Sequence, residues 1–377
     1  MGPLAGIKCV EVGGIGPAPF CGMMLADMGA EIIRVERKGY TPPIELKYDI
    51  MVRGRKAIIG IDLKTSKGIE AVLKLVDQSE ILFEGFRPGV MEKLGLGPDI
   101  CLKRNPRLVY GRVTGWGQEG PLSSVAGHDI NYIALVGALH AIGYPGQKPV
   151  PPINLVGDYA GGGMLLAFGL LCGLLRARQT GQGQVVDTAM VDGVALLMAT
   201  TFGLLATGLW KEERGRNLLD GGAHFYDTYE TADGKYISIG SIESKFYDLL
   251  LKLLGITDPE FHPRMNQERW PALKERLAAI FKTKSRAEWC RTLGGEDVCF
   301  APVLSLTEAF DDPHNVARKA FVDIDGVRQP AAAPRFSHTQ PETHGVPPTN
   351  AEHNDSILKT WGFSAEEIEG LRKKRVF

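Results

Sequence analysis

A histidine directly followed by an aspartate, in the stretch GHDINY at residues 127–132, is a place where side chains could move a proton. Imidazole has a reference pKa of about 6.5, so both of its forms are accessible near neutral pH. Most such neighbours are structural, however, and mark a polar patch where a loop meets a helix. His128 and Asp129 therefore indicate proton transfer only if other residues of the chain support it.

Two more carboxylates are candidates for acid–base work. Asp158, in NLVGDYAGGG, precedes a long apolar segment. It is either a helix N-cap or a carboxylate held near amide donors. In the second case the small residues 160–163 would form a floor on which a flat ligand could lie. Glu243, in IGSIES, follows a predicted hairpin strand and is either a surface glutamate or part of the same site.

The elements that must position these residues alternate between strand and helix over the first 200 residues. Strands are expected at 7–12, 31–36, 56–63, 81–86 and 107–113, and helices at 20–29 and 68–79. The long apolar segment after Asp158 predicts a further helix, and residues 183–202 read as a strand followed by a helix. This alternation predicts an α/β domain with a Rossmann-like parallel sheet.

The character of the sequence changes near Tyr226, where a hairpin is expected around Asp233 and Gly234. Two amphipathic helices follow, so we expect a smaller α+β domain. The predicted organisation is a large domain at 1–200, a linker at 201–222, a small domain at 223–325 and a segment at 326–377 that returns to the large domain. Five prolines at 330–348 make this return extended, and Ser364 with Glu367 predicts a capped terminal helix.

Composition excludes several classes of protein. The 377 residues carry a net charge of −1, which argues against a nucleic-acid-coating protein. The six cysteines are widely spaced without a CxxC pair, which indicates neither a disulfide framework nor a zinc site, so no metal is expected. Residues 160–175 are uncharged but too short to span a bilayer, which favours a core helix. No targeting segment is evident, so the expected location is intracellular and soluble, cytoplasmic by default, with a peroxisomal or mitochondrial location left open.

A dinucleotide-binding motif is suggested and then fails. Gly14 and Gly16 could open a G-x-G-x-x-G turn, and Glu36 stands where an acidic ribose ligand would be. The third glycine position is Pro19, whose ring obstructs close packing and whose nitrogen donates no hydrogen bond. A tight turn that opens a Rossmann-like unit is the better interpretation.

Cations recur at the ends of the predicted strands, where open parallel sheets bind their ligands. Together they would suit a multiply phosphorylated ligand, although each alone is more often a solvated surface charge. They are Arg37, Lys38, the segment 53–56, Lys64, Arg87 and Arg112.

Several blocks together make the chain similar to a known family. GHDINY, the N-L-x-x-D-x-A-G-G-G block, GQVVDTAMVDG and LLDGGAHFYDTYETADGKY resemble the family III CoA-transferase superfamily and, within it, the α-methylacyl-CoA racemases. The resemblance covers nearly the whole chain. It implies a Rossmann-like large domain and a small domain, in an interlocked homodimer whose active site lies between the large domain of one chain and the small domain of the other.

The resemblance also implies functional residues. The catalytic histidine falls on His128, the catalytic aspartate on Asp158, and a glutamate that supports the histidine on Glu243. The implied CoA-binding positions are Arg37, Ile61, Asp62, Leu63, Lys64, Arg87, Lys93, Gly127, Asp129, Ile130, Asn131 and Tyr132. The family often has proline where this chain has His224 and Ser244, which we expect to alter the acyl pocket and the pose of Glu243.

The expected enzyme is an isomerase of lipid metabolism that interconverts (2R)- and (2S)-2-methylacyl-CoA thioesters through an enolate. Inversion removes a proton from one face of the α-carbon and delivers one to the other, so His128 and Asp158 would serve opposite faces. The CoA thioester is the substrate and no cofactor is expected. The alternatives are a family III CoA transferase with Asp158 as nucleophile, a non-catalytic acyl-CoA-binding protein and, already weakened by Pro19, a dehydrogenase.

Overall fold

The computed structural model of the protein describes residues 2–39, 49–348 and 350–377, which divide into two compact units. The first unit comprises Met1–Val136, Ile153–Leu197 and Ala317–Phe377, and the second comprises Gly137–Pro152 and Met198–Val316. Residues 137–152, expected in the large domain, therefore cluster with the second unit. Each unit has its own hydrophobic core.

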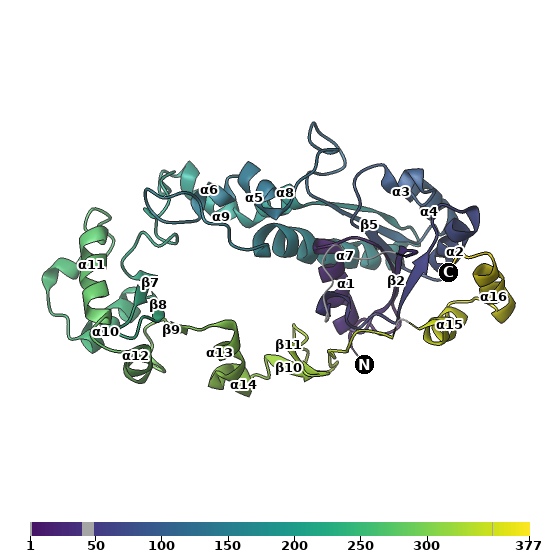
Figure 1. The fold of residues 1–377 in the computed structure, drawn as a ribbon. Helices are drawn as coiled ribbons and strands as arrows, with labels where there is room; N and C mark the ends of the chain where they lie inside the picture. The colour runs from purple at the N-terminus through teal and green to yellow at the C-terminus, as the bar shows by residue number, and fades with distance from the viewer. Residues whose placement is uncertain (1, 40–48, 349) are drawn as a thin grey trace. The chain divides into compact units, whose positions relative to one another are not determined.

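A six-stranded parallel sheet forms the centre of the first unit and confirms the predicted α/β fold (Figure 1). Its strand order is β3-β2-β1-β4-β5-β6, the order of a doubly wound nucleotide-binding fold, in which ligands bind where the winding reverses between β1 and β4. The strands are β1 (Lys8–Val12), β2 (Glu31–Arg37), β3 (Ala57–Ile61), β4 (Ile81–Glu84), β5 (Val109–Thr114) and β6 (Gln184–Ala189).

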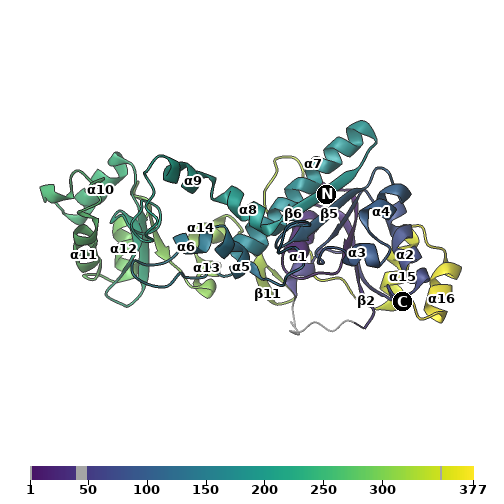
Figure 2. The ribbon, with the colours of Figure 1, turned by 90° about the horizontal axis from the view of Figure 1, so that it is seen from above.

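Both faces of this sheet are covered, so its inner strands are largely buried, and the charged residues within them, such as Glu11 and Arg34, are paired with one another. On β1, Cys9 packs toward α1 (Pro17–Asp27) and α7 (Leu165–Thr180), whereas Val10 packs toward the opposite face. That opposite face is covered by α2 (Ser66–Asp77), α4 (Pro98–Arg104), α15 (Ala351–Thr360) and α16 (Ala365–Lys373), as Figures 1 and 2 show. Helix α1 begins three residues earlier than predicted, because Pro17 is favoured in the first helical turn.

The remaining elements of the first unit connect the strands or follow the second unit in sequence. They are a short 3₁₀ turn (Ile50–Val52), α3 (Val90–Lys93), α5 (Asp129–Leu135), a π-helix (Leu155–Met164), α8 (Met190–Leu197), β10 (Phe321–Ile324) and β11 (Val327–Pro330). The predicted domain boundary at 325/326 falls in the turn between β10 and β11, which pair as an antiparallel hairpin. Their hydrogen-bonded ladder keeps this stretch together, so it cannot divide two domains.

The second unit is an α+β structure built on a three-stranded antiparallel sheet, β7-β8-β9. The predicted hairpin is β7 (Tyr226–Glu230) with β8 (Tyr236–Gly240), and β9 (Phe300–Val303) adds the third strand. Its helices are α6 (Ala138–Ala141), α9 (Ala199–Ala206), α10 (Ser244–Leu254), a 3₁₀ turn (Pro259–Phe261), α11 (Trp270–Phe281), α12 (Arg286–Leu293), α13 (Leu306–Asp311) and α14 (Pro313–Ala317), whose last residue begins the third segment of the first unit.

His224 lies in the core of the second unit, where its side chain is fully buried. Its Nε2 lies 2.7 Å from the hydroxyl of Tyr247, and its carbonyl accepts a hydrogen bond of 2.6 Å from the hydroxyl of Tyr229. Burial, with a smaller contribution from Lys274, lowers the pKa of His224 to about 4. The ring packs against Phe225 and other aromatic rings of the core, and the expected effect of His224 on an acyl pocket stays a prediction.

The buried His224 should make stability depend on pH. Its folded pKa lies below its unfolded value of about 6.5, so its contribution to stability is complete above pH 6.5 and is lost as the pH falls toward 4. This loss amounts to about 2 kcal/mol at pH 5. Urea unfolding followed by tryptophan fluorescence should show the decline, and the His224→Gln variant should show a smaller one. An equal decline in both proteins would contradict this account.

Candidate functional site

A cavity of about 480 Å³ lies at the carboxyl ends of β1, β4 and β5, where the winding of the sheet reverses. The turns that follow these strands form one wall, and the start of α5 and the π-helix form another. The lining residues include Gly16, Pro17, Gly85, Phe86, Arg87, Pro88, Gly115, Trp116, Gly127, His128, Tyr132, Asn154, Asp158, Tyr159 and Met190. All of them belong to the first unit.

His128 and Asp158, thirty residues apart in sequence, both line this cavity. His128 is the residue before α5 and has an extended backbone. Its amide donates a 3.0 Å hydrogen bond to Oδ1 of Asn131, which fixes the entry into the helix. The side chain of His128 is exposed, whereas that of Asp158 is half-buried. The cavity thus holds one imidazole and one carboxylate on separate segments.

Asp129 does not pair with the imidazole of its neighbour. Its carboxylate is buried, and Oδ1 accepts hydrogen bonds from the amides of Gly157 at 2.6 Å and Asp158 at 2.8 Å. A side chain at residue 157 would not fit, because a Cβ there would lie 2.5 Å from this oxygen. The histidine–aspartate pair therefore links the start of α5 to the backbone of Asp158.

The carboxylate of Asp158 has few favourable contacts. Asn154 Nδ2 donates a 3.0 Å hydrogen bond to its Oδ2, and a Cβ at Gly16 would lie 3.2 Å from the same oxygen. Burial raises the pKa of Asp158, and the charge of Asp129 raises it further, against the opposing effects of Asn154 and His128. The interpretation of Asp158 as a carboxylate held near amide donors is wrong for the amides of residues 157 and 158, because both already donate to Asp129 Oδ1. For the same reason these two amides are not available to an oxyanion.

The glycines after Asp158 serve helix packing and do not form a ligand floor. A Cβ at Gly161 would lie 3.0 Å from Val194 of α8, and one at Gly162 would lie 2.9 Å from Pro17 of α1. At Gly163 a Cβ would lie 2.8 Å from the ring of Phe20. These close approaches hold the π-helix between α1 and α8, and Asp158 lies inside this helix, not at its N-cap.

The failed dinucleotide motif is explained by the same packing. The position over Gly16 is occupied by the Asp158 carboxylate. Pro17 begins α1 and, like Pro19, has no amide hydrogen to offer a phosphate. Glu36 accepts a 2.9 Å hydrogen bond from Arg34 Nε and is engaged in an ion pair.

The implied CoA-binding residues are only partly brought together. Arg87, Gly127 and Tyr132 line the cavity, and the Tyr132 ring meets Trp116 edge to face with centroids 4.8 Å apart. Ile130 and Asn131 are exposed on α5, and Lys93 is exposed on α3. The others lie outside the cavity lining, at the ends of β2 and β3: Arg37, Ile61, Asp62, Leu63 and Lys64.

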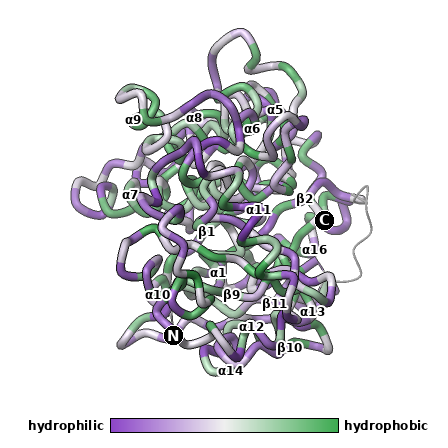
Figure 3. The backbone as a smooth tube through the Cα atoms, turned by 90° about the vertical axis from the view of Figure 1, so that its left-hand side faces the viewer, coloured by the Kyte–Doolittle hydropathy of each residue, from purple (hydrophilic) through white to green (hydrophobic). Residues whose placement is uncertain are grey.

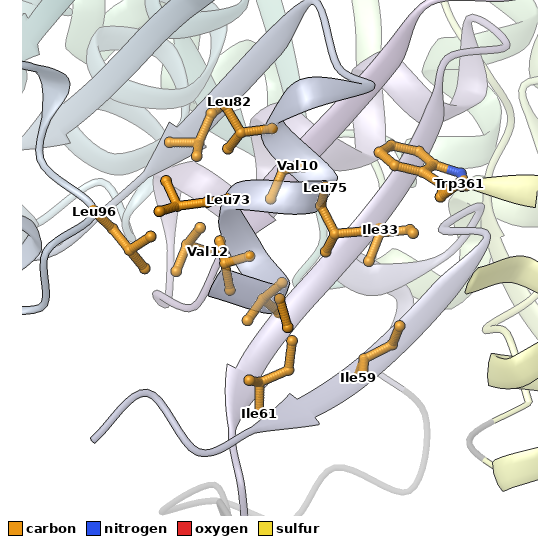
Figure 4. Packing of buried hydrophobic residues seen from close by; sticks show 14 of the residues in the cluster. Val10, Val12, Ile33, Ile59, Ile61, Leu73, Leu75, Leu82, Leu96 and Trp361 are labelled. Atoms are coloured by element: carbon orange, nitrogen blue, oxygen red, sulfur yellow. The ribbon is translucent and has the colours of Figure 1, made fainter. Parts of the chain in front are cut away.

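The side chains of Ile61 and Asp129 are buried and are not available to contact a ligand. The side chain of Ile61 is fully buried in the core on one face of the sheet, as Figure 4 shows. The carboxylate of Asp129 is buried against residues 157 and 158. Only main-chain atoms of these two positions are available to a ligand.

Glu243 lies in the second unit, directly before α10, and its side chain is exposed. Its carbonyl accepts hydrogen bonds from the amides of Phe246 and Tyr247, as at an ordinary helix start. The hydroxyl of Ser244 accepts a 2.8 Å hydrogen bond from Arg264, whose Nε also binds the carbonyl of Ile242. These contacts fix the backbone on both sides of Glu243.

Sequence reasoning missed or misread several polar residues near the cavity. Asn154, which binds the Asp158 carboxylate, precedes it by four residues, and that helical spacing was the available signal. Arg112 was expected among cations that meet a phosphorylated ligand, but it is buried between Glu84 and Glu92. No local pattern distinguishes such a buried arginine from an exposed one.

Comparison with known proteins places this geometry in a family. The sequence is 43% identical over 379 residues to the α-methylacyl-CoA racemase of Mus musculus, covering 99% of this chain and 97% of that protein. It is 42% identical to the α-methylacyl-CoA racemase of Homo sapiens, again covering 99% of this chain and 97% of that protein. Among solved structures, a CAIB/BAIF family protein from Brucella suis matches with a TM-score of 0.81 and 27% identity, over 96% of this chain and 99% of that one.

The pattern of CoA-transferase family III matches residues 4–354, which include the whole second unit, most of the first and every residue of the cavity. The chain belongs to CoA-transferase family III.

Proposed function

We propose that this protein is an isomerase, an α-methylacyl-CoA racemase that interconverts (2R)- and (2S)-2-methylacyl-CoA thioesters. The observation that carries the proposal is the presence of His128 and Asp158, an imidazole and a carboxylate on different segments, in one cavity at the switch point of the sheet. The similarity to racemases of 42–43% identity over nearly the whole chain supports the same reaction. The acyl-CoA is the substrate, so the residues need supply only acid, base and hydrogen-bond donors.

In the proposed mechanism, His128 and Asp158 act on opposite faces of the thioester α-carbon. In one direction one group removes the α-proton as a base, and the other delivers a proton as an acid; in the reverse direction the roles exchange. The raised pKa of Asp158 suits this double role. The carboxyl group gains and loses its proton at a pH closer to neutrality than an ordinary aspartate does.

The enolate oxygen formed between these steps requires hydrogen-bond donors. The first amides of a helix have no partner within the helix, and those of Asp129 and Ile130 open α5 beside His128. We therefore assign the donor role to the start of α5, in place of the amides next to Asp158. The carboxylate of Asp129 would then hold the second base while its own amide faces the substrate.

Glu243 is proposed to orient His128 from a second copy of the chain, as in the interlocked homodimer that the resemblance implies. Exposed apolar side chains on each unit support such a partner: some are on α7 and α8 of the first unit, and others are on α9 of the second (Figure 3 shows the hydrophobic character of α9). They include Phe168, Leu175, Leu196, Leu197, Phe202 and Leu205.

Residues Leu155–Thr180 are long and apolar enough to cross a bilayer, with a mean hydropathy of 1.6 over the most apolar window. Half of that window is buried, and α7 packs on β5 and β6. The segment is therefore better explained as a core helix of an intracellular enzyme than as a membrane anchor.

A CoA transferase with Asp158 as nucleophile is the second candidate, favoured by the family itself. A transferase needs no second base, so His128 would have no role in it. The two reactions also differ in their products, because only racemisation exchanges the α-hydrogen with solvent.

The direct test of the reaction is incubation with (2R)-2-methylacyl-CoA in deuterated water. Racemisation predicts one deuterium at the α-carbon and an approach to equal amounts of the two epimers, measured by mass spectrometry and chiral chromatography. The double variant His128→Ala/Asp158→Ala is the control and should show neither change. Absence of label, together with transfer of CoA to an added carboxylic acid, would establish the transferase instead.

The two bases should be separable by epimer. His128→Ala and Asp158→Ala should each reduce racemisation about 10²–10⁴-fold, the range expected for loss of a general acid–base group. Each variant should nevertheless retain hydrogen–deuterium exchange in one epimer, and the retained epimer should differ between the two variants. Equal loss of exchange from both epimers in both variants would contradict bases on opposite faces.

Replacement of Asp129 by asparagine should shift the pH profile. The substitution preserves an oxygen for the amides of Gly157 and Asp158 but removes the negative charge that raises the pKa of Asp158. The pKa of Asp158 should therefore fall, and the acidic limb of kcat/KM should move to lower pH in the direction in which Asp158 is the base. Asn154→Ala is the opposite control, because it removes a hydrogen bond that lowers this pKa. A limb that stays in place in both variants would show that Asp158 does not titrate in it.

A further inference from the structure

Three charged side chains, of which two are buried, lie beneath the loop that follows β4. Glu84, the last residue of β4, is fully buried, and Arg112 on β5 is 6% exposed. Arg112 Nε donates a 3.0 Å hydrogen bond to Glu84, and its two terminal nitrogens donate to the two oxygens of Glu92 at 2.8 and 3.2 Å. Glu92 belongs to α3, so one guanidinium ties both the strand before the loop at residues 85–89 and the helix after it to β5.

The second oxygen of Glu84 sets the path of the chain at the start of this loop. It accepts a 2.6 Å hydrogen bond from the amide of Phe86, directly before Arg87. The Phe86 ring covers the turn after β1, where a Cβ at Gly13 would lie 2.5 Å from it. Glu84 and the turn after β1 thus hold residues 85–88, which line the cavity that contains His128 and Asp158.

Stability alone does not explain why charged side chains are buried here. A buried carboxylate and a buried guanidinium lose their hydration, and well-packed apolar residues are often at least as stabilising in such a place. Burial raises the pKa of Glu84 to about 7, so its charge depends on the bonds from Phe86 and Arg112, which oppose that shift. What the group provides is a defined loop and helix, with the exposed cation Arg87 in the loop and the exposed cation Lys93 at the end of α3.

We propose that Glu84, Arg112 and Glu92 are positioning residues, which hold the loop after β4 so that Arg87 and Lys93 meet the phosphates of an acyl-CoA. This inference rests on the proposed function, since it assumes a CoA thioester in the cavity. It assigns the three residues to recognition of the nucleotide end of the substrate and leaves proton transfer to His128 and Asp158. Their loss should therefore raise KM for acyl-CoA much more than it lowers kcat.

The test compares Glu84→Gln and Glu92→Gln with the parent protein on two substrates, a 2-methylacyl-CoA and the matching acyl-pantetheine, which has no phosphate. For acyl-CoA, Glu84→Gln should raise KM, and the calorimetric Kd of CoA, about tenfold, the size expected for loss of a charge-assisted hydrogen bond. The side chain of Glu92 is 45% exposed, so we expect its replacement to disturb folding less. Glu92→Gln should raise KM for acyl-CoA and the Kd of CoA as well. For acyl-pantetheine, kcat/KM should be the same in the variants and the parent.

Glu80→Gln is the matched control, because Glu80 precedes β4 and pairs with Arg178 at 2.9 Å, outside the cavity lining. It should leave the Kd of CoA unchanged. Folded variants that lose activity equally on both substrates, or that bind CoA as tightly as the parent, would overturn the inference. A parent protein that binds CoA without exchanging the α-hydrogen would instead refute the proposed reaction, and the Kd values would still decide the inference.

Discussion

The hydrogen bonds from the amides of Gly157 and Asp158 to Asp129 are the interaction on which the proposed site depends. They join the start of α5, which carries His128, to the π-helix that carries Asp158. They are thus a direct polar link between two segments that lie almost thirty residues apart in sequence. The bonds also place one negative charge near another, which contributes to the raised pKa of Asp158.

Close backbone packing completes the constraint. Gly161, Gly162 and Gly163 let the π-helix approach α1 and α8 closely, since a Cβ at any of them would lie 2.8–3.0 Å from a neighbouring side chain. The turn after β1 ends at Gly16, which lies against the Asp158 carboxylate. The turn that follows the central strand therefore also limits the space around this carboxylate. A fold often associated with dinucleotides thereby presents a carboxylate where a phosphate would otherwise approach the first helix.

Much of the fold could be predicted because its signals are local. The alternation of short strand and helix signals predicted the parallel sheet whose core includes Val10, Ile33 and Leu82, and Pro19 weakened the case for dinucleotide binding. The site was harder to predict. The sequence indicated His128 and Asp158 as candidates. It did not indicate that Asp129 binds the amides of Gly157 and Asp158, because these residues follow Asp129 by 28 and 29 positions and no local pattern connects them. A glycine has no side chain to indicate whether it faces a ligand or a helix, and Arg112 resembles an exposed cation until its carboxylate partners are placed in space.

The central claim is that an imidazole and a carboxylate flank one α-carbon. A crystal structure of the protein with a bound 2-methylacyl-CoA tests it most directly. We expect the ring of His128 and the carboxylate of Asp158 on opposite sides of the α-carbon, each within hydrogen-bonding reach of the position its proton would occupy. If both groups lie on the same side of that carbon, or if either points away from it, the account is contradicted.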